Sequence, residues 1–368
     1  MRILFTGGGT GGHIFPIVAV ARELRKIQGD LELFYLGPSD FDLQPLIAEN
    51  IKVKVIFAGK IRRYFSFYNF IDILKIPLGF LQAFWYLYIL MPDVIFSKGG
   101  YGSVPVVIIG WIFRIPILIH ESDTIPGLAN KLAGKLAKRI GVSFEVTKKY
   151  FSAKKTALVG NPIRTELTRG NKDEGRKIFK IKSKDPVILI IGGSQGAQSI
   201  NAIILEILIE LLKKYEIIHM CGSKNYSQIK KLAILNKEKK GSILEKYHLF
   251  PFLYEEQLKH AYAVSDLAIS RAGSGSIFEI AACGLPSIII PLPWSSSSHQ
   301  KENAFTYAKS GATIVIEQVN LTPHILLERI SYLISHPDLR KKMSECALKF
   351  ATPEAGEKIA KGLLELAS

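Results

Sequence analysis

An apolar strand, a glycine-rich turn and an amphipathic helix follow one another near the start of each half of this 368-residue chain. In the first half, residues 1–5 lead into GGGTGGH and then into a helical pattern over residues 14–28. In the second half, residues 187–191 lead into GGSQGAQS. This order opens the doubly wound, parallel sheets of the Rossmann type. The recurrence therefore predicts an α/β protein made of two similar folds in tandem.

Other short apolar runs alternate with helical patterns, as expected of parallel sheets covered by helices. The further strands expected in the first half cover residues 31–36, 52–57, 94–96 and 117–119, with a long apolar-aromatic helix or helix pair over 69–90. Those expected in the second half cover 219–221, 267–269, 287–291 and 313–316. A polar, charged segment after GNPIRTEL marks a boundary. We expect an N-terminal domain over 1–162, a C-terminal domain over 163–345, and a C-terminal helix within 346–368 that packs back on the first domain.

Lysine and arginine outnumber aspartate and glutamate by 48 to 32, which gives a net charge of +16. Such a charge favours polyanions, whether nucleic acid, anionic lipid or phosphorylated substrates, and it also serves solubility. The three cysteines are far apart and lack CxxC spacing, so we expect neither a disulfide framework nor a zinc site. No leader precedes the first strand, and no apolar run reaches 18 residues. The sequence thus predicts a cytoplasmic protein without a spanning helix.

Four glycine-rich turns each follow an expected strand, where open α/β sheets bind their ligands. They occupy residues 7–12, 97–103, 192–197 and 270–276. Backbone amides at such turns favour anionic groups. The second strand ends in Leu36-Gly37-Pro38 without an acid for a ribose, which argues against a nicotinamide enzyme. His13 is a candidate general base because an imidazole titrates near neutral pH, and Glu279 could accept hydrogen bonds from a ribose diol.

The ordered set GGGTGGHIFP, SKGGYGSVP, HESDTIPGLANK, GNPIR, GGSQGAQSIN, SRAGSGSIFEIAACGLPSIIIPLP and HQKENA resembles the MurG family of bacterial peptidoglycan enzymes. These enzymes are undecaprenyldiphospho-muramoylpentapeptide β-N-acetylglucosaminyltransferases. The resemblance implies a glycosyltransferase B fold, with two Rossmann-like domains facing a cleft. It also implies inverting transfer of N-acetylglucosamine from UDP-N-acetylglucosamine (UDP-GlcNAc) to the muramoyl 4-hydroxyl of lipid I, which gives lipid II and UDP.

The resemblance also assigns site residues. On the catalytic side it implies His13 as the base and Tyr101 in the acceptor loop. For substrate binding it implies Thr10, Gly11, Gly12, Asp123, Arg164, Ser194, Leu253, Ser274, Gly275, Ser276, Glu279 and Gln300. Glu279 would hold the ribose, Gln300 the sugar hydroxyls, and the backbone of Leu253 the uracil. The chain departs from the common pattern at Asp123, where many members carry asparagine.

The same resemblance implies no cofactor and no metal, because amides, helix starts and Arg164 can stabilise the leaving UDP. The implied partners are UDP-GlcNAc, lipid I and an anionic inner-membrane surface, with no nucleic acid. The protein would act peripherally on the cytoplasmic face of the cell membrane. The expected contact surface joins the basic-aromatic segment 60–70 to Phe80, Phe84 and Trp85. A second basic run consists of Lys131, Lys135, Lys138 and Arg139.

Two other readings of the sequence stay open. A UDP-GlcNAc 2-epimerase, or a transferase with a soluble acceptor, would share the C-terminal nucleotide site and would not need the basic-aromatic surface. A catalytically idle protein could bind nucleotide sugar or nucleic acid through its charge. His13 and Tyr101 argue against an idle protein, and no nucleic-acid recognition motif is present.

Overall fold

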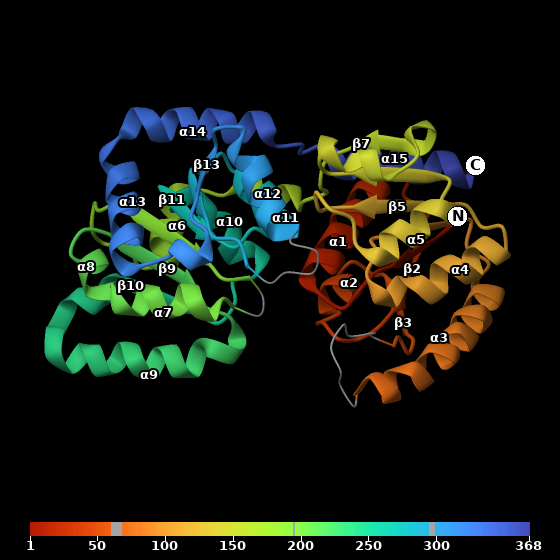
Figure 1. The fold of residues 1–368 in the computed structure, drawn as a ribbon, viewed down its shortest axis with the longest axis horizontal. Helices are drawn as coiled ribbons and strands as arrows, with labels where there is room; N and C mark the ends of the chain where they lie inside the picture. The colour runs from red at the N-terminus through yellow and green to blue at the C-terminus, as the bar shows by residue number, and fades with distance from the viewer. Residues whose placement is uncertain (60–67, 194–195, 294–298) are drawn as a thin grey trace. The chain divides into compact units, whose positions relative to one another are not determined.

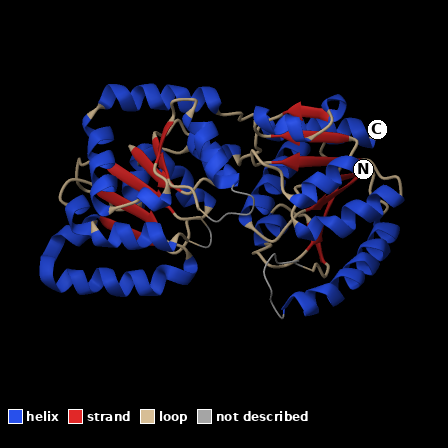
Figure 2. Ribbon diagram, in the orientation of Figure 1, coloured by secondary structure: helices blue, strands red, loops and turns tan. Residues whose placement is uncertain are grey.

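The computed structural model describes residues 1–59, 68–193, 196–293 and 299–368. The chain divides into two compact units, which are Met1–Arg164 together with Thr352–Ser368, and Thr165–Ala351. Each unit holds one parallel sheet covered by helices (Figure 2). The predicted α/β class with two Rossmann-like domains is therefore confirmed.

In the first unit the sheet has the order β3-β2-β1-β4-β5-β6-β7, so the direction of winding reverses between β1 and β4. Its strands are β1 (Arg2–Thr6), β2 (Glu32–Gly37), β3 (Lys52–Val55), β4 (Val94–Ser97), β5 (Ile117–Glu121), β6 (Arg139–Val142) and β7 (Thr156–Leu158). Its α-helices are α1 (Gly11–Ile27), α2 (Gln44–Ala48), α3 (Tyr68–Leu90), α4 (Val104–Ile112), α5 (Leu128–Leu136) and α15 (Ala355–Ala367) (Figure 1).

Both faces of this sheet are buried, because successive side chains of a strand point to opposite sides. In β1, Ile3 and Phe5 join a core cluster with α1 and α15. Leu4, between them, belongs to a second cluster with α3, α4 and α5. This burial on both sides explains why the strands read as continuous apolar runs and not as alternating ones.

The second unit repeats this plan with the sheet order β10-β9-β8-β11-β12-β13, which reverses between β8 and β11. Its strands are β8 (Val187–Ile191), β9 (Glu216–Met220), β10 (Tyr247–Phe250), β11 (Leu267–Ser270), β12 (Ser287–Ile289) and β13 (Thr313–Val315). Its α-helices are α6 (Lys172–Ile178), α7 (Gln198–Glu206), α8 (Leu208–Leu212), α9 (Ser223–Lys240), α10 (Glu255–Val264), α11 (Ser274–Ala282), α12 (His299–Ala308), α13 (Pro323–Ser335) and α14 (Pro337–Phe350).

The last two helices belong to different units. Helix α14 contacts α11 of the second unit, whereas α15 packs along α1 of the first. Ile359, Ala360 and Leu363 of α15 are buried in the same cluster as Ile17 of α1. The chain therefore returns to the first unit at Thr352, after α14 has ended.

Candidate active site

The four glycine turns meet in pairs, one pair in each unit. Thr6, at the end of β1, lies opposite Ser97, at the end of β4, so the turns that follow these strands start at the same edge of the sheet. In the second unit Ile191 of β8 lies opposite Ser270 of β11 in the same way. Both pairs stand where the strand order reverses, which is the place where open α/β sheets bind ligands.

His13, in the first turn of α1, lies half-buried between the two turns of the first unit. Its Nδ1 is 2.7 Å from the hydroxyl oxygen of Thr10. Burial lowers the pKa of His13 to about 4, the charge of Lys98 lowers it further, and Asp123 opposes this shift. The imidazole is therefore neutral at pH 7 and keeps one nitrogen able to accept a proton.

The glycine turn after β4 approaches the glycine turn after β1 so closely that only glycine fits at position 100. Gly100 has a φ of +84°, and a Cβ on it would come within 2.8 Å of the Cα of Gly8 and 3.1 Å of Nε2 of His13. Side chains other than glycine rarely adopt this backbone conformation. The two glycines thus make the space that the imidazole occupies.

Glu121, at the end of β5, organises the loop that carries Asp123. Its buried carboxylate accepts hydrogen bonds from the backbone N–H of Asp123 (2.9 Å), the backbone N–H of Gly127 (3.2 Å) and Nδ2 of Asn130 (3.0 Å). Burial raises the pKa of Glu121. Glu121 and Asn130 both stand in the HESDTIPGLANK motif, but the motif by itself predicts no role for either side chain.

Tyr101 lies at the other side of the first turn. Its hydroxyl donates a hydrogen bond to the carboxylate of Asp40, in the loop after β2. Asp40 packs so closely on Gly9 that a Cβ added to Gly9 would clash with the side chain of Asp40. The predicted site residue Tyr101 is thereby brought next to the first turn by a partner, Asp40, that the sequence analysis left without a role.

Arg164 is buried, and its guanidinium lies 4.2 Å from the centre of the Phe15 ring. Phe15 is two residues after His13 in α1, and its ring packs edge-to-face against Phe41. Gly11 faces the same two rings. Four of the predicted residues therefore lie around the start of α1, namely Thr10, Gly11, Gly12 and Arg164.

In the second unit the start of α11 presents open backbone. Ser274, Gly275 and Ser276 form its first turn, and Gly273 is the residue that precedes it. A Cβ placed on Gly273 or on Gly275 would meet no atom within 4 Å. The N–H groups and the dipole of a helix start favour an anion, so this turn has both the access and the polarity for a phosphate.

Two side chains shape the surroundings of that turn. Glu279, one turn into α11, accepts a hydrogen bond from the hydroxyl of Tyr262 at 3.2 Å. Arg271 donates to the carbonyl of Ile290 and to side-chain oxygens of Ser199 and Gln318. Arg271 thus ties α7, the end of β12 and the loop after β13 to the turn, a role that the sequence analysis did not predict.

The other predicted contacts are spread over the loops of this unit. Gln300, in α12, accepts a hydrogen bond from the backbone N–H of Leu292 at 3.0 Å. Leu253 is fully buried, and its N–H has the sulfur of Met220 as acceptor at 3.4 Å. A thioether is a weak acceptor. Ser194 lies outside the described residues.

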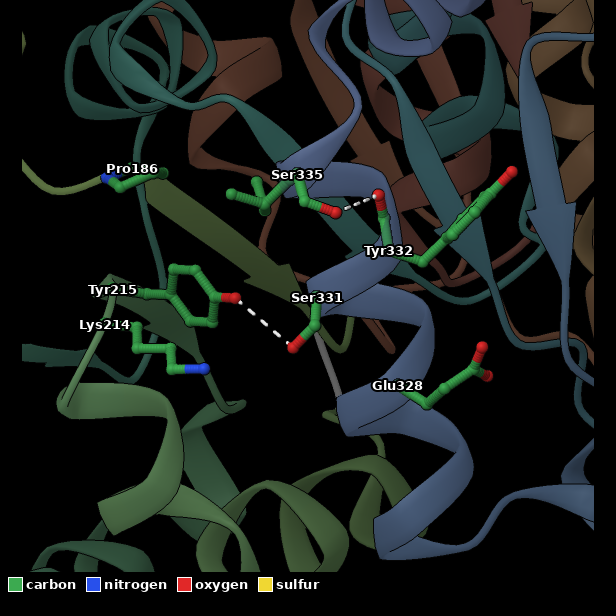
Figure 3. A pocket seen from close by; sticks show the side chains of 8 residues that line it. Pro186, Lys214, Tyr215, Glu328, Ser331, Tyr332 and Ser335 are labelled. Atoms are coloured by element: carbon green, nitrogen blue, oxygen red, sulfur yellow. Dashed lines mark hydrogen bonds between the residues drawn. The ribbon is translucent and has the colours of Figure 1, made fainter.

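One hollow in the second unit lies at the opposite edge of the sheet (Figure 3). Its volume is about 600 Å³, and it is lined by Pro186, Lys214 and Tyr215 and by residues of α13 that include Tyr332. Pro186 directly precedes β8, so the hollow is at the amino end of the strands, away from the glycine turns. Within the described part of the chain, no three His, Cys, Asp or Glu side chains are grouped to hold a metal ion.

Family models match both units. Residues 3–142 match the glycosyltransferase family 28 N-terminal domain, and residues 187–359 match the glycosyltransferase family 28 C-terminal domain. The first match lies within the first unit, whereas the second covers most of the second unit and continues into α15, which belongs to the first unit.

Relatives match nearly the whole chain. A protein of Clostridium tetani is 39% identical over 334 residues, which cover 90% of this chain and 89% of the relative. A protein of Caldanaerobacter subterraneus is 37% identical over 361 residues and 98% of each chain. Both are named UDP-N-acetylglucosamine–N-acetylmuramyl-(pentapeptide) pyrophosphoryl-undecaprenol N-acetylglucosamine transferase.

Solved structures agree with the fold. The crystal structure of Acinetobacter baumannii MurG is similar with a TM-score of 0.73 and 26% identity, over 99% of both chains. A UDP-GlcNAc 2-epimerase from Neisseria meningitidis bound to UDP-GlcNAc gives a TM-score of 0.70 at 15% identity, over 99% of this chain and 100% of the epimerase. At that identity the epimerase shows a shared fold alone.

Proposed function

This chain belongs to the family of UDP-N-acetylglucosamine–N-acetylmuramyl-(pentapeptide) pyrophosphoryl-undecaprenol N-acetylglucosamine transferases, and we propose that it moves N-acetylglucosamine from UDP-GlcNAc to the muramoyl 4-hydroxyl of lipid I. The products are lipid II and UDP. The observation that carries the proposal is a neutral His13 held between two glycine turns, in a chain whose other unit offers an open helix start for a diphosphate.

The proposed reaction is a single displacement that inverts the anomeric carbon. The acceptor oxygen forms a bond to C1 of the sugar while the bond between C1 and the diphosphate oxygen breaks. His13 takes the proton of the acceptor hydroxyl as that oxygen attacks, and UDP leaves with the electron pair. A base that is already neutral at pH 7 suits this step, because it does not have to lose a proton first.

The leaving diphosphate gains negative charge in the transition state. The first turn of α11, Ser274 to Ser276, has open space beside Gly273 and Gly275 for an anion, and the guanidinium of Arg164 is a fixed positive charge. Preorganised donors of this kind stabilise developing charge strongly. We therefore propose transfer without a metal ion, with Ser194 as a further donor to a phosphate oxygen.

The remaining predicted residues receive binding roles in this proposal. Glu279 holds the ribose diol, the backbone of Leu253 meets the uracil, and Gln300 binds sugar hydroxyls after it exchanges its contact with Leu292. Thr10, Gly11 and Gly12 line the first turn. Asp123 faces the sugar as a hydrogen-bond acceptor, and Tyr101 lies on the acceptor side.

We also propose that the first unit binds peripherally to the anionic cytoplasmic face of the membrane. On α3, the side chains of Leu81, Trp85 and Tyr88 are 66%, 60% and 62% exposed, and they follow one another at helical spacing on one face. Helix α4 packs on α3 and adds the exposed Trp111 and Ile112 (Figure 1). An apolar face of this kind suits insertion at a lipid interface.

The same unit also carries exposed basic side chains. Arg114 follows α4, and Lys131, Lys135 and Lys138 lie on and after α5, while Arg139 is exposed but pairs with Glu365 of α15. Lysine and arginine near an anionic bilayer each add about 1 kcal/mol of attraction. Within the described residues, none of the helices combines the length and apolar character needed to cross a bilayer. The predicted segment from Lys60 to Phe67 lies outside the described residues.

The test is an assay with purified protein, UDP-GlcNAc and a lipid I analogue in the presence of EDTA, which follows UDP release together with the disaccharide product. We expect product from the wild type with EDTA present, and its loss in His13→Ala. Product retained in that variant would remove His13 as the base. Formation of UDP-N-acetylmannosamine without disaccharide would replace the transferase proposal by the epimerase reading.

A further inference from the structure

Lys98, the first residue after β4, is a buried cation without a hydrogen-bond partner. Its side chain is 2% exposed, and Nζ contacts no acceptor within the described chain. Burial lowers the pKa of Lys98 to about 8, while Glu121 and Asp123 act in the opposite direction and favour the charged form. An ammonium group in such a place is expensive unless nearby charge compensates it.

The fold places Lys98 next to the proposed base. A Cβ on Gly7 would lie 3.5 Å from Cβ of Lys98 and 3.3 Å from Cβ of His13, so both side chains start beside this glycine. Ser97 lies opposite Ile119 in the sheet, which brings Lys98 to the same edge as Glu121. The side chain of Lys98 therefore starts beside α1, at the edge of the sheet where the loop that carries Asp123 begins.

The two carboxylates near Lys98 differ in their surroundings. Glu121 already accepts three N–H groups, which hold it in place whatever Lys98 does. Asp123 is half-buried in the loop that those bonds organise, and it acts on both Lys98 and His13. Lys98 can therefore balance the effect that the carboxylate of Asp123 has on His13.

We propose that Lys98 is a positioning residue for the transfer reaction, whose buried ammonium offsets the effect of the Asp123 carboxylate on the imidazole of His13. The inference rests on the proposed role of His13 as the base. It adds that the base on α1, the ammonium just after β4 and the carboxylate in the loop after β5 work as one electrostatic unit.

The signs of the two effects on His13 are opposite. The positive charge of Lys98 lowers the pKa of His13, and the negative charge of Asp123 raises it. Removal of Lys98 alone leaves Asp123 unopposed, so the imidazole binds a proton at higher pH. When both charges are removed, the two opposite effects on the pKa of His13 largely cancel. Of the other titratable groups at this edge, burial keeps His120 neutral, Glu121 is held by its donors, and Asp40 is bound by Tyr101.

The experiment compares full-length wild type with Lys98→Met, Asp123→Asn and the double variant. Two quantities are measured between pH 3 and 9, namely kcat/KM with UDP-GlcNAc and a lipid I analogue, and the pKa of His13 by NMR of labelled histidines, assigned with His13→Gln. Lys358→Met is the matched control, because Lys358 is an exposed lysine of the same unit that pairs with Glu354 on α15. We expect it to match the wild type.

For Lys98→Met we expect the pKa of His13 and the acidic limb of kcat/KM to rise together by about one pH unit, with a loss in kcat/KM of about twofold at pH 5 and about fivefold at pH 4. For Asp123→Asn we expect the pKa of His13 and the midpoint of the acidic limb to fall. The double variant should return close to the wild-type pH profile, and its loss of kcat/KM should be smaller than the product of the single losses. If Lys98→Met does not fold, the double variant compared with Asp123→Asn measures the same coupling.

Two results would overturn the inference. An unchanged pKa of His13 in Lys98→Met, with losses that multiply in the double variant, would show that Lys98 only packs. A shifted pKa of His13 with an unshifted acidic limb would instead show that His13 is not the base, and the proposed function would then fail at that residue.

Discussion

The hydroxyl oxygen of Thr10 lies 2.7 Å from Nδ1 of His13, three residues later in the chain. If Nδ1 carries the proton and donates it to Thr10, Nε2 is the nitrogen left to accept a proton. Nε2 is also the ring atom that faces Gly100 of the second turn. Thr10 therefore orients the candidate base, in addition to the contact with substrate that the sequence resemblance implied.

Replacement of Thr10 tests this orientation. We expect Thr10→Val, which keeps the shape and loses the hydroxyl, to lower kcat about tenfold, because the imidazole loses the partner that selects its tautomer. Thr10→Ser keeps the hydroxyl and should stay within about twofold of the wild type. Equal losses in both variants, measured by steady-state kinetics, would contradict the tautomer role.

The acidic limb of the pH profile reports the pKa of the base. Since burial lowers the pKa of His13 to about 4, we expect kcat/KM to stay level as the pH falls from 7 to about 5, and to drop as the imidazole takes up a proton near pH 4. The unfolded chain binds that proton at its ordinary value near 6.5, so folding loses stability as the pH falls below 6.5. A midpoint of kcat/KM near 6.5 would show that burial does not lower the pKa of the catalytic base in the free enzyme.

Gly100 gives a sharp test of the packing between the two turns. With a φ of +84° and Gly8 within 2.8 Å of a new Cβ, Gly100→Ala should destabilise the fold by about 1–3 kcal/mol and displace the imidazole. Urea unfolding measures the stability, and the transferase assay measures the activity. Gly29→Ala, at a position where a Cβ meets no atom within 4 Å, is the control and should change neither.

Glu279 should act in binding of the donor and not in the chemical step. We expect Glu279→Ala to raise KM for UDP-GlcNAc about tenfold with little change in kcat, because hydrogen bonds to the ribose are the same in ground state and transition state. Glu328→Ala, which removes an exposed carboxylate of α13 in the same unit, should leave KM unchanged. A fall in kcat alone would argue that Glu279 acts on the reacting sugar.

The exposed face of α3 predicts binding to lipid. In co-sedimentation with vesicles that contain anionic phospholipid, Trp85→Glu with Tyr88→Glu should lower the bound fraction several-fold, because each change puts a charge into an apolar interface. Turnover of a water-soluble acceptor should not change. Val319→Glu is the control, since Val319 is 83% exposed in the second unit. Equal lipid binding by all proteins would contradict the proposal.

The sequence alone determined the elements of the fold whose signals are local. The strand–turn–helix segments at residues 1–28 and from residue 187 were predicted because an apolar run, a set of glycines and a helical period occur together within about 30 residues. Strands β6, β7 and β10 were not predicted. β7 and β10 are short edge strands and partly exposed, and β6 is only four residues long with Arg139 and Gly141 in it, so all three lack the apolar run that marks a central strand.

The sequence also supplied the predicted site residues, some from glycine turns that follow strands and most from the resemblance to a known family. It did not yield the roles of Lys98, Glu121 and Asn130. Nothing close in sequence shows that Lys98 faces His13, which is 85 residues earlier in the chain. That proximity arises because β4 pairs with β1 in the sheet, so the ends of two distant strands share one edge.

The tertiary structure decided, in the same way, which groups are charged. A net charge taken from composition treats each lysine as a cation and assigns each histidine its ordinary pKa. Burial beside Gly7 and Gly100 lowers the pKa values of Lys98 and His13, because desolvation disfavours the charged form. Residue types and their order are local properties of the chain, whereas desolvation and charge coupling depend on which segments pack together.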